Sequence, residues 1–149
     1  MAAVAGAIAE YVGQRLVEKS KGEVIVENGG DTFVNLSSGC VVGIHAGNSI
    51  LSGRVGIRLD DLDFPLGVCT SSGTLGHSRS YGQADAVTVV SPRCALADAA
   101  ATAAGNMVRA KRDIQKALDF LQQIDGVKGA VVVKGDCVGA FGHIELVAL

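Results

Sequence analysis

The stretch from Leu66 to Asn106 places the tightest constraint on the fold of this chain. Two apolar runs, Leu66–Cys69 and Ala84–Val90, predict strands on either side of a loop rich in hydroxyl and glycine residues at Thr70–Ser78. Such a loop can turn several backbone N–H groups towards one point and so cradle an anion such as a phosphate. The candidate ligand-binding residues of this loop are Thr70, Ser71, Ser72, Gly73 and His77.

An alanine-rich helix is predicted directly after the second strand. Ser91 followed by Pro92 is a typical helix start, with serine as the N-cap and proline at the first position. Asp98 and Thr102 then lie one turn apart on one face of the helix, where a carboxylate and a hydroxyl can share a cation. The alternatives for Asp98 are a solvent-exposed side chain or an ion pair with a cation such as Arg93.

The other elements follow from hydrophobic periodicity and turn residues. Apolar residues at helical spacing predict a helix at Ala2–Glu18 and another at Asn106–Gln123, with Gly105 and Asn106 marking the break before it. Strands are predicted at Glu23–Glu27, after the turn Asn28–Asp31 through Leu36, and at Cys40–Ala46, Arg54–Leu59, Val127–Lys134 and Val138–Leu149. These elements predict an α+β fold in which antiparallel sheets pack against helices, beginning with a strand meander.

Composition limits the size and the partners of the protein. A chain of 149 residues is enough for one domain, but only 4% of it is aromatic although 48% is hydrophobic. A partner subunit or a missing segment is therefore expected to help cover its strands. The net charge of −2 argues against a nucleic-acid partner. Because Glu10 interrupts the apolar start, we expect no membrane-spanning segment and a cytoplasmic location. The four cysteines are far apart, form no C-x-x-C pair and lie mostly in apolar runs, so we expect them to be reduced and buried.

The turn at Asn28, Gly29, Gly30 and Asp31 leaves two interpretations open. It is either a plain hairpin turn or a place where a ligand approaches the glycines closely. Ser71 and His77 could form a nucleophile and base, but the chain has no G-x-S-x-G motif and no identifiable acid to orient the histidine. No catalytic residue is therefore assigned.

Three segments in one order resemble the motifs of the ApbE-type flavin transferases. They are Gly6-Ala7-Ile8-Ala9, Val26 to Asp31 (V-E-N-G-G-D) and Ala97 to Thr102 (A-D-A-A-A-T). The runs Gly67–Ser78 and Ala97–Asn106 resemble even more closely an uncharacterised bacterial and archaeal family with an ApbE-like, T-fold-like architecture. The resemblance implies a Mg²⁺ site at Asp98 and Thr102 beside the pyrophosphate of FAD, with Asn28–Asp31 and Thr70–Gly73 contacting the nucleotide.

Two departures from the transferase pattern bear on activity. Glu10-Tyr11-Val12 stands where those transferases have lysine-glycine-tyrosine, and their histidine-isoleucine-aspartate-proline segment is reduced to Gly76-His77-Ser78. The resemblance also implies that residues 1–149 form a single ApbE-like domain without the family's N-terminal portion. The expected function is Mg²⁺-assisted binding of a flavin or another phosphate-bearing nucleotide, with FMN transfer left open. The alternative is a non-catalytic, homo-oligomeric structural or interaction protein.

Overall fold

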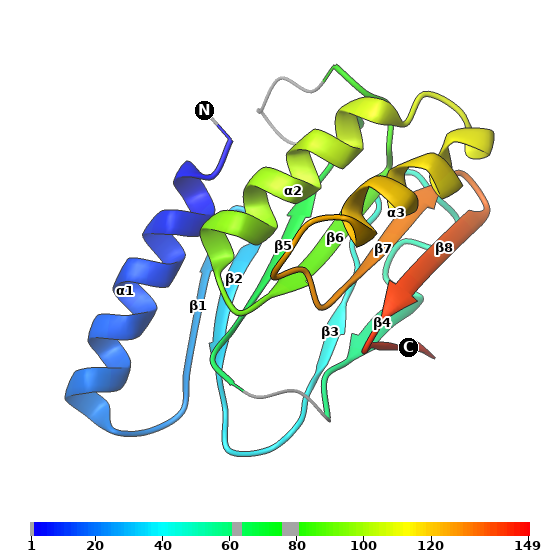
Figure 1. Ribbon diagram of the computed structural model, residues 1–149. Helices are drawn as coiled ribbons and strands as arrows, with labels where there is room; N and C mark the ends of the chain where they lie inside the picture. Colours follow the sequence, from blue (N-terminus) through cyan, green and yellow to red (C-terminus); the bar gives the residue numbers. More distant parts are fainter. Residues whose placement is uncertain (1, 61–63, 76–80) are drawn as a thin grey trace.

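A computed structural model of the chain, which describes residues 2–60, 64–75 and 81–149, has three layers (Figure 1). Three helices cover one face of a six-stranded antiparallel sheet, and a three-stranded antiparallel sheet covers the other face. The predicted α+β class with antiparallel sheets is confirmed. The helices are α1 (Val4–Ser20), α2 (Cys94–Met107) and α3 (Ile114–Gln122), with a 3₁₀ turn at Lys111–Asp113 before α3.

The large sheet has the strand order β1-β2-β5-β6-β7-β8, and the small sheet has the order β3-β4-β9. The strands of the large sheet are β1 (Val24–Asn28), β2 (Asp31–Asn35), β5 (Leu66–Ser71), β6 (Ala86–Ser91), β7 (Gly129–Lys134) and β8 (Cys137–Gly142). Those of the small sheet are β3 (Val41–Gly43), β4 (Val55–Arg58) and β9 (Glu145–Ala148). The predicted continuous meander is wrong, because the β1–β2 hairpin and the β3–β4 hairpin belong to different sheets.

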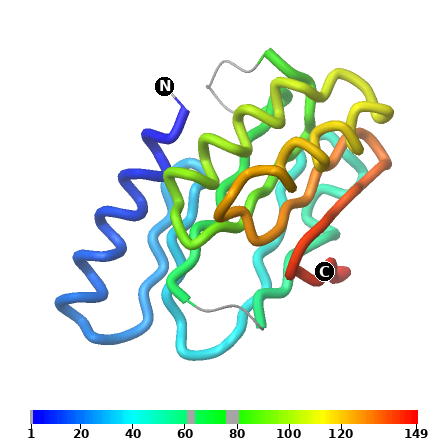
Figure 2. Tube along the Cα trace, in the orientation of Figure 1, coloured from blue at the N-terminus to red at the C-terminus, as the bar shows by residue number. Residues whose placement is uncertain are grey.

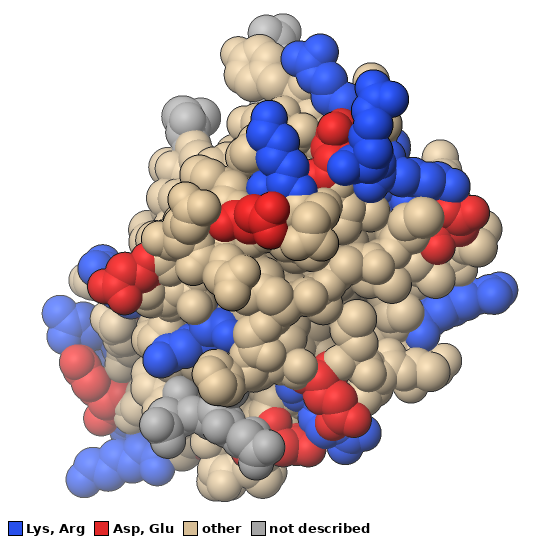
Figure 3. Space-filling model, turned by 45° about the vertical axis from the view of Figure 1, so that its right-hand side comes forward, with Lys and Arg blue, Asp and Glu red and all other residues tan. Residues whose placement is uncertain are grey.

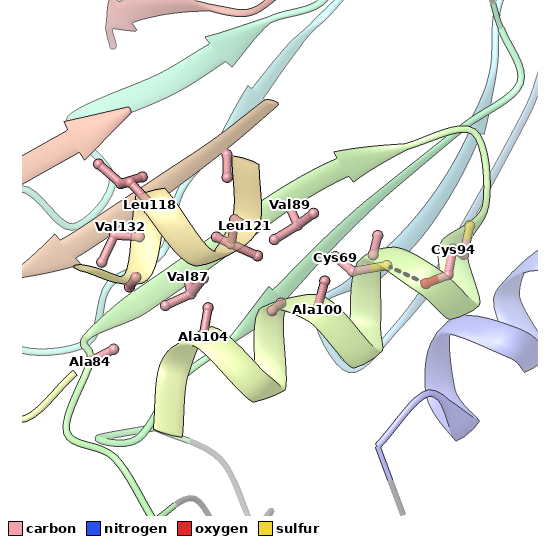
Figure 4. Packing of buried hydrophobic residues seen from close by; sticks show 14 of the residues in the cluster. Cys69, Ala84, Val87, Val89, Cys94, Ala100, Ala104, Leu118, Leu121 and Val132 are labelled. Carbon is pink, nitrogen blue, oxygen red and sulfur yellow. Dashed lines mark hydrogen bonds between the residues drawn. The ribbon is translucent and has the colours of Figure 1, made fainter. Parts of the chain in front are cut away.

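The central strands are buried on both faces, which explains their continuous apolar sequence. On β6, Val87 and Val89 point towards the helices, whereas Ala86 and Val90 point towards the small sheet. Figure 4 shows the helical side of this core, where Ala100 and Ala104 of α2 pack above the sheet. Alanines at these positions allow the helix to approach the strands closely, so the low aromatic content is compatible with a dry core.

Helix α2 begins two residues later than predicted, at Cys94 rather than at Pro92. Ser91 is the last residue of β6, where it pairs with Gly67, and its hydroxyl accepts a hydrogen bond from Arg93 N at 3.1 Å. The helix N-terminus is capped from outside: Glu10 of α1 accepts a hydrogen bond from Ala95 N at 3.1 Å. A carboxylate at this position also favours the helix dipole, so a local N-cap is unnecessary.

Two further boundaries differ from the sequence expectation. α2 continues through Gly105 to Met107, so the predicted break lies inside the helix, and the next helix begins at Ile114 rather than at Asn106. The predicted final strand is divided at Gly142, which has φ of 97°, into β8 of the large sheet and β9 of the small sheet. The inward face predicted for the following helix is confirmed, because Ile114, Ala117, Leu118 and Leu121 are all buried.

α1 has its largest apolar side chains on the outside. Its buried residues are Gly6, Ala9 and Gly13, and a Cβ on Gly13 would lie 2.2 Å from the ring of Phe33. Figure 2 shows α1 at one edge of the molecule, beside β1 and α2. The apolar period therefore located the helix correctly, but it marks the solvent-facing side rather than the core side.

The surface is of mixed charge. Figure 3 shows Lys and Arg side chains lying beside Asp and Glu side chains over one face of the molecule. No helix in the described ranges is both long and apolar enough to cross a bilayer.

Candidate functional site

Three segments that are distant in sequence meet at the first turn of α1. Gly6 N donates a hydrogen bond to Asp98 Oδ2 of α2 at 3.0 Å, and Asn28 Nδ2 of the β1–β2 turn donates to Ala5 O at 3.2 Å. A Cβ on Gly6 would lie 2.6 Å from Cys94 O and 2.7 Å from Asp98 Cβ. The residue at position 6 must therefore be glycine for α1 to come close enough to contact the aspartate.

Asp98 is buried, with 8% of its surface exposed, and Thr102 lies half-buried one turn further along α2. The placement of both residues on α2 agrees with the sequence expectation. Neither alternative for Asp98 holds, since it is not solvated and Arg93 instead lies near Glu10, with Nε 3.8 Å from Oε1. The first of the three segments that resemble ApbE motifs, Gly6 to Ala9, thus contacts the last of them, Ala97 to Thr102.

Asp31 is a second buried carboxylate at the same place. It begins β2 opposite Cys69 of β5, on the sheet face that carries the helices, and 6% of its surface is exposed. Burial, followed by the nearby charge of Asp98, raises the pKa of Asp31 to about 7, against a weaker lowering by its hydrogen bond with Cys69. Asp31 and Asp98 therefore form an electrostatically coupled pair in a poorly solvated site.

The pair has no compensating positive charge among the described residues. Neither carboxylate takes part in an ion pair there, and Asp98 uses one oxygen for Gly6 N. Carboxylate and hydroxyl oxygens are the ligands that Mg²⁺ prefers, so Asp31, Asp98 and Thr102 fit a hard cation. Over the described ranges no cluster of three or more His, Cys, Asp or Glu side chains could hold a metal, so water or ligand oxygens would have to complete the coordination.

The β1–β2 turn at Asn28–Asp31 is a hairpin turn, which was one of the two interpretations of its sequence. Gly29 and Gly30 have φ of 63° and 98°, and Gly30 N donates to Glu27 Oε1 at 2.7 Å. Nothing lies within 4 Å of a Cβ built on Gly29. The turn is thus open on its outer side, and ligand contact by Asn28, Gly29 and Gly30 stays a prediction.

The loop after β5 is bonded mainly to itself and to its neighbours. Ser72 Oγ accepts hydrogen bonds from the N–H groups of Thr74 and Leu75, at 3.1 and 3.0 Å, and Gly73 N donates to Ala84 O at 2.8 Å. These three N–H groups are already paired and are not free to hold an anion. His77 lies outside the described residues, so its predicted role is not placed.

Thr70 and Ser71 belong to β5 rather than to a loop, and they point to opposite faces of the sheet. Thr70 Oγ1 lies 2.9 Å from Thr88 Oγ1, on the face of the small sheet. Ser71 faces α2, where its Oγ would lie 3.7 Å from a Cβ on Gly105. Of the two, only Ser71 is on the side of the sheet that holds the carboxylate pair.

Asp85 is a buried acid that the sequence analysis did not single out. Its Oδ1 accepts from Thr74 Oγ1 at 3.0 Å, its Oδ2 accepts from Gly135 N at 2.6 Å, and Lys134 Nζ lies 3.7 Å away. It therefore ties the loop after β5 to the β7–β8 turn. The sequence does contain a signal for a buried acid here, because Asp85 lies between two alanines at the start of the apolar run Ala84–Val90.

The two buried cysteines beside the carboxylates are thiols. Cys69 Sγ donates to the carbonyl of Cys94 at 3.4 Å (Figure 4), and all four cysteines are free. The hydrogen bond with Cys94 and burial raise the pKa of the Cys69 thiol. The expectation of reduced cysteines fits, although Cys40 and Cys137 are only half-buried.

Comparison with solved structures defines the class of the protein. The fold matches that of the flavinyl transferase ApbE of Pseudomonas stutzeri, apo form, with a TM-score of 0.56 over 91% of this chain and 46% of that one, at 19% sequence identity. This is therefore an α+β protein with an ApbE-like fold. The chain belongs to the family described as AbpE bacteria, whose model matches residues 1–146.

Archaeal relatives cover nearly all of the chain. It is 47% identical to UPF0280 protein MK0206 of Methanopyrus kandleri, over 96% of this chain and 59% of the relative. It is 46% identical to UPF0280 protein MJ1526 of Methanocaldococcus jannaschii, over 99% of this chain and 62% of the relative. The chain thus spans about three-fifths of the length of the curated relatives that it matches.

Proposed function

We propose that this domain binds a divalent cation, with Mg²⁺ as the candidate, and through it the pyrophosphate of FAD or a related nucleotide. The observation that carries the proposal is the meeting of Asp31 and Asp98, two buried carboxylates without a basic partner in the described structure. A bound Mg²⁺ would supply positive charge that neutralises both the carboxylates and the phosphates. The ApbE-like fold agrees with a flavin ligand.

Different residues of the chain would have different roles in binding. Asp98 and Thr102 present oxygens from one face of α2, while the hydrogen bond from Gly6 N fixes the orientation of the Asp98 carboxylate. Asp31 adds negative charge from the sheet, and the open turn at Asn28–Gly30 lies where a nucleotide could approach. The proposal concerns binding, and no residue is assigned to a transfer step.

Isothermal titration with FAD, in the presence and in the absence of MgCl₂, tests this proposal. We expect Mg²⁺ to tighten FAD binding, and Asp98→Asn and Thr102→Val to weaken it by about 10- to 100-fold in Mg²⁺. Asp125→Asn is the matched control, because Asp125 is an exposed residue of the α3–β7 connection. FAD binding that ignores both Mg²⁺ and Asp98→Asn would contradict the proposal.

The alternative, a homo-oligomeric structural or interaction protein, makes a different prediction. Its melting temperature would rise with protein concentration and would not respond to FAD or Mg²⁺. The same variants measured by thermal unfolding therefore distinguish the two functions.

A further inference from the structure

α1 carries a continuous apolar stripe on its solvent side, made of Val4, Ile8, Tyr11, Val12 and Leu16. Ile8 is 52% exposed and Tyr11 is 63% exposed. Residues three and four apart lie on one helix face, so these side chains form one stripe along the helix. The opposite face of the helix, with Gly6, Ala9 and Gly13, makes the contacts with α2, β1 and β2.

The placement of large apolar side chains outside and small residues inside is the reverse of that in a typical surface helix of a monomer. An amphipathic helix normally buries its large apolar side chains and exposes its polar ones. Here the buried residues of the helix are small and allow close backbone contact, and Val17 packs against the core. The five large side chains of the stripe are instead 39% to 63% exposed. Contiguous exposed apolar surface of this kind is typical of a docking surface.

The length of the relatives indicates what covers this face. About two-fifths of MK0206 and of MJ1526 has no counterpart in this chain, and more than half of the ApbE chain has none, although the shared fold spans 91% of this chain. In each case further polypeptide accompanies the same domain. A polypeptide with an apolar face would bury the stripe and add a packing contact on the outer face of α1.

The charges on α1 disfavour a lipid surface as the occupant. Glu18 and Arg15 form an ion pair with Nη1 and Oε2 3.0 Å apart, and Arg15 also lies over the Tyr11 ring, 5.6 Å from its centroid. Helices that bind anionic membranes carry an excess of Lys and Arg beside the apolar face. The rim of this stripe has both signs of charge, which suits a protein surface.

We infer that the outer face of α1 is an interface for the polypeptide that makes up the remaining two-fifths of the archaeal relatives, docking through the stripe from Val4 to Leu16. This interface lies on the face of α1 opposite the one that contacts Asp98, and the inference does not rest on the proposed nucleotide binding. It also explains why α1, whose first turn contacts Asp98, exposes its large apolar side chains.

The test coexpresses the unmatched portion of MJ1526, as a separate polypeptide, with this chain. We expect a one-to-one complex on size-exclusion chromatography with light scattering, and a dissociation constant raised by at least about tenfold in the double variant Ile8→Gln, Tyr11→Gln. The matched control is Ile50→Gln, Tyr81→Gln, because Ile50 and Tyr81 are also exposed but do not belong to α1. Circular dichroism establishes that both variants remain folded.

A second measurement uses the unaltered chain, which has two tyrosines, one in the stripe and one outside it. Radical footprinting should give protection of Tyr11 but not of Tyr81 in the complex. The inference is overturned if no complex forms, if the stripe variant binds as well as the control, or if Tyr81 is protected and Tyr11 is not. Protection of Tyr11 in this chain alone at high concentration would instead assign the face to a second copy. Protection by vesicles of phosphatidylglycerol would assign it to a membrane.

Discussion

The substitution Asp31→Asn should stabilise the protein at neutral and alkaline pH when divalent cations are absent. The pKa of Asp31 is raised from 3.8 to about 7 by burial and by Asp98, so the folded state holds a proton that the unfolded state releases. Between these two values the free energy of unfolding falls as the pH rises. At 1.36 kcal/mol per pKa unit the full shift corresponds to about 4 kcal/mol.

Solvent screening at the site reduces this figure, and we expect Asp31→Asn to gain on the order of 2 to 4 kcal/mol at about pH 8. Near pH 4 the gain should be below about 1 kcal/mol, because the pH is then close to the unfolded-state pKa of 3.8 and the two states differ by less than one bound proton. Urea unfolding in EDTA across this pH range measures the difference. The amide keeps the shape of the protonated carboxyl, so packing is preserved.

Asp125→Asn serves again as the control, and its stability should follow that of the unaltered protein at every pH. Adding MgCl₂ should narrow the gap between Asp31→Asn and the unaltered protein, because a cation would stabilise the ionised pair. The reasoning would be refuted by an Asp31→Asn variant that is no more stable than the unaltered protein at about pH 8. It would also be refuted if both proteins had the same pH profile.

Two packing features of α1 give further predictions. Glu10→Gln weakens the cap on Ala95 N and should lower the free energy of unfolding by about 0.5–1 kcal/mol, measured by urea unfolding; a larger loss in high salt than in low salt would contradict the electrostatic part of this account. Gly13→Ala places a Cβ 2.2 Å from the buried Phe33 ring, so a packing cost of about 1–3 kcal/mol should exceed the gain of about 1 kcal/mol in helix propensity. Gly22→Ala, which meets nothing closer than 3.8 Å, is the control in the same thermal-unfolding series.

Local signals were enough to predict the elements that local chemistry determines. The β1–β2 hairpin follows from glycines at Gly29 and Gly30, whose positive φ few other residues adopt. The helical spacing of Asp98 and Thr102 follows from an alanine-rich run, and the inward face of α3 follows from its apolar period. In these segments each residue's preference agrees with the fold.

Other features depend on contacts that a local pattern does not contain. Ser91 and Pro92 have the chemistry of a helix start, but pairing of Ser91 with Gly67 extends β6, and Glu10 supplies the cap from another helix. The division of the last apolar run between two sheets likewise depends on which strand each half can pair with. The outward stripe of α1 is a similar case. An apolar period predicts which face of a helix is covered, but it does not show whether this domain or another polypeptide covers that face.

The candidate site was only partly predictable for the same reason. Asp98 was identified from its helix, whereas its proximity to Asp31 depends on α1 and β2 packing against α2. The amides of the loop after β5 looked suited to an anion, but Ser72 and Ala84 occupy those of Gly73 to Leu75. Side-chain competition for backbone donors is difficult to foresee from composition alone.

The hydrogen bond between Gly6 N and Asp98 joins residues 92 positions apart, and it makes the site dependent on how firmly α1 is docked. When α1 detaches in a local opening, the carboxylate loses its orienting donor and the neighbouring turn loses its contact at Ala5. A ligand held by Asp98 would therefore draw its affinity partly from the closed population and would slow amide hydrogen exchange along α1. Whatever covers the outer face of the helix would act on the same equilibrium, so the two surfaces of α1 are thermodynamically linked even though no residue contacts both.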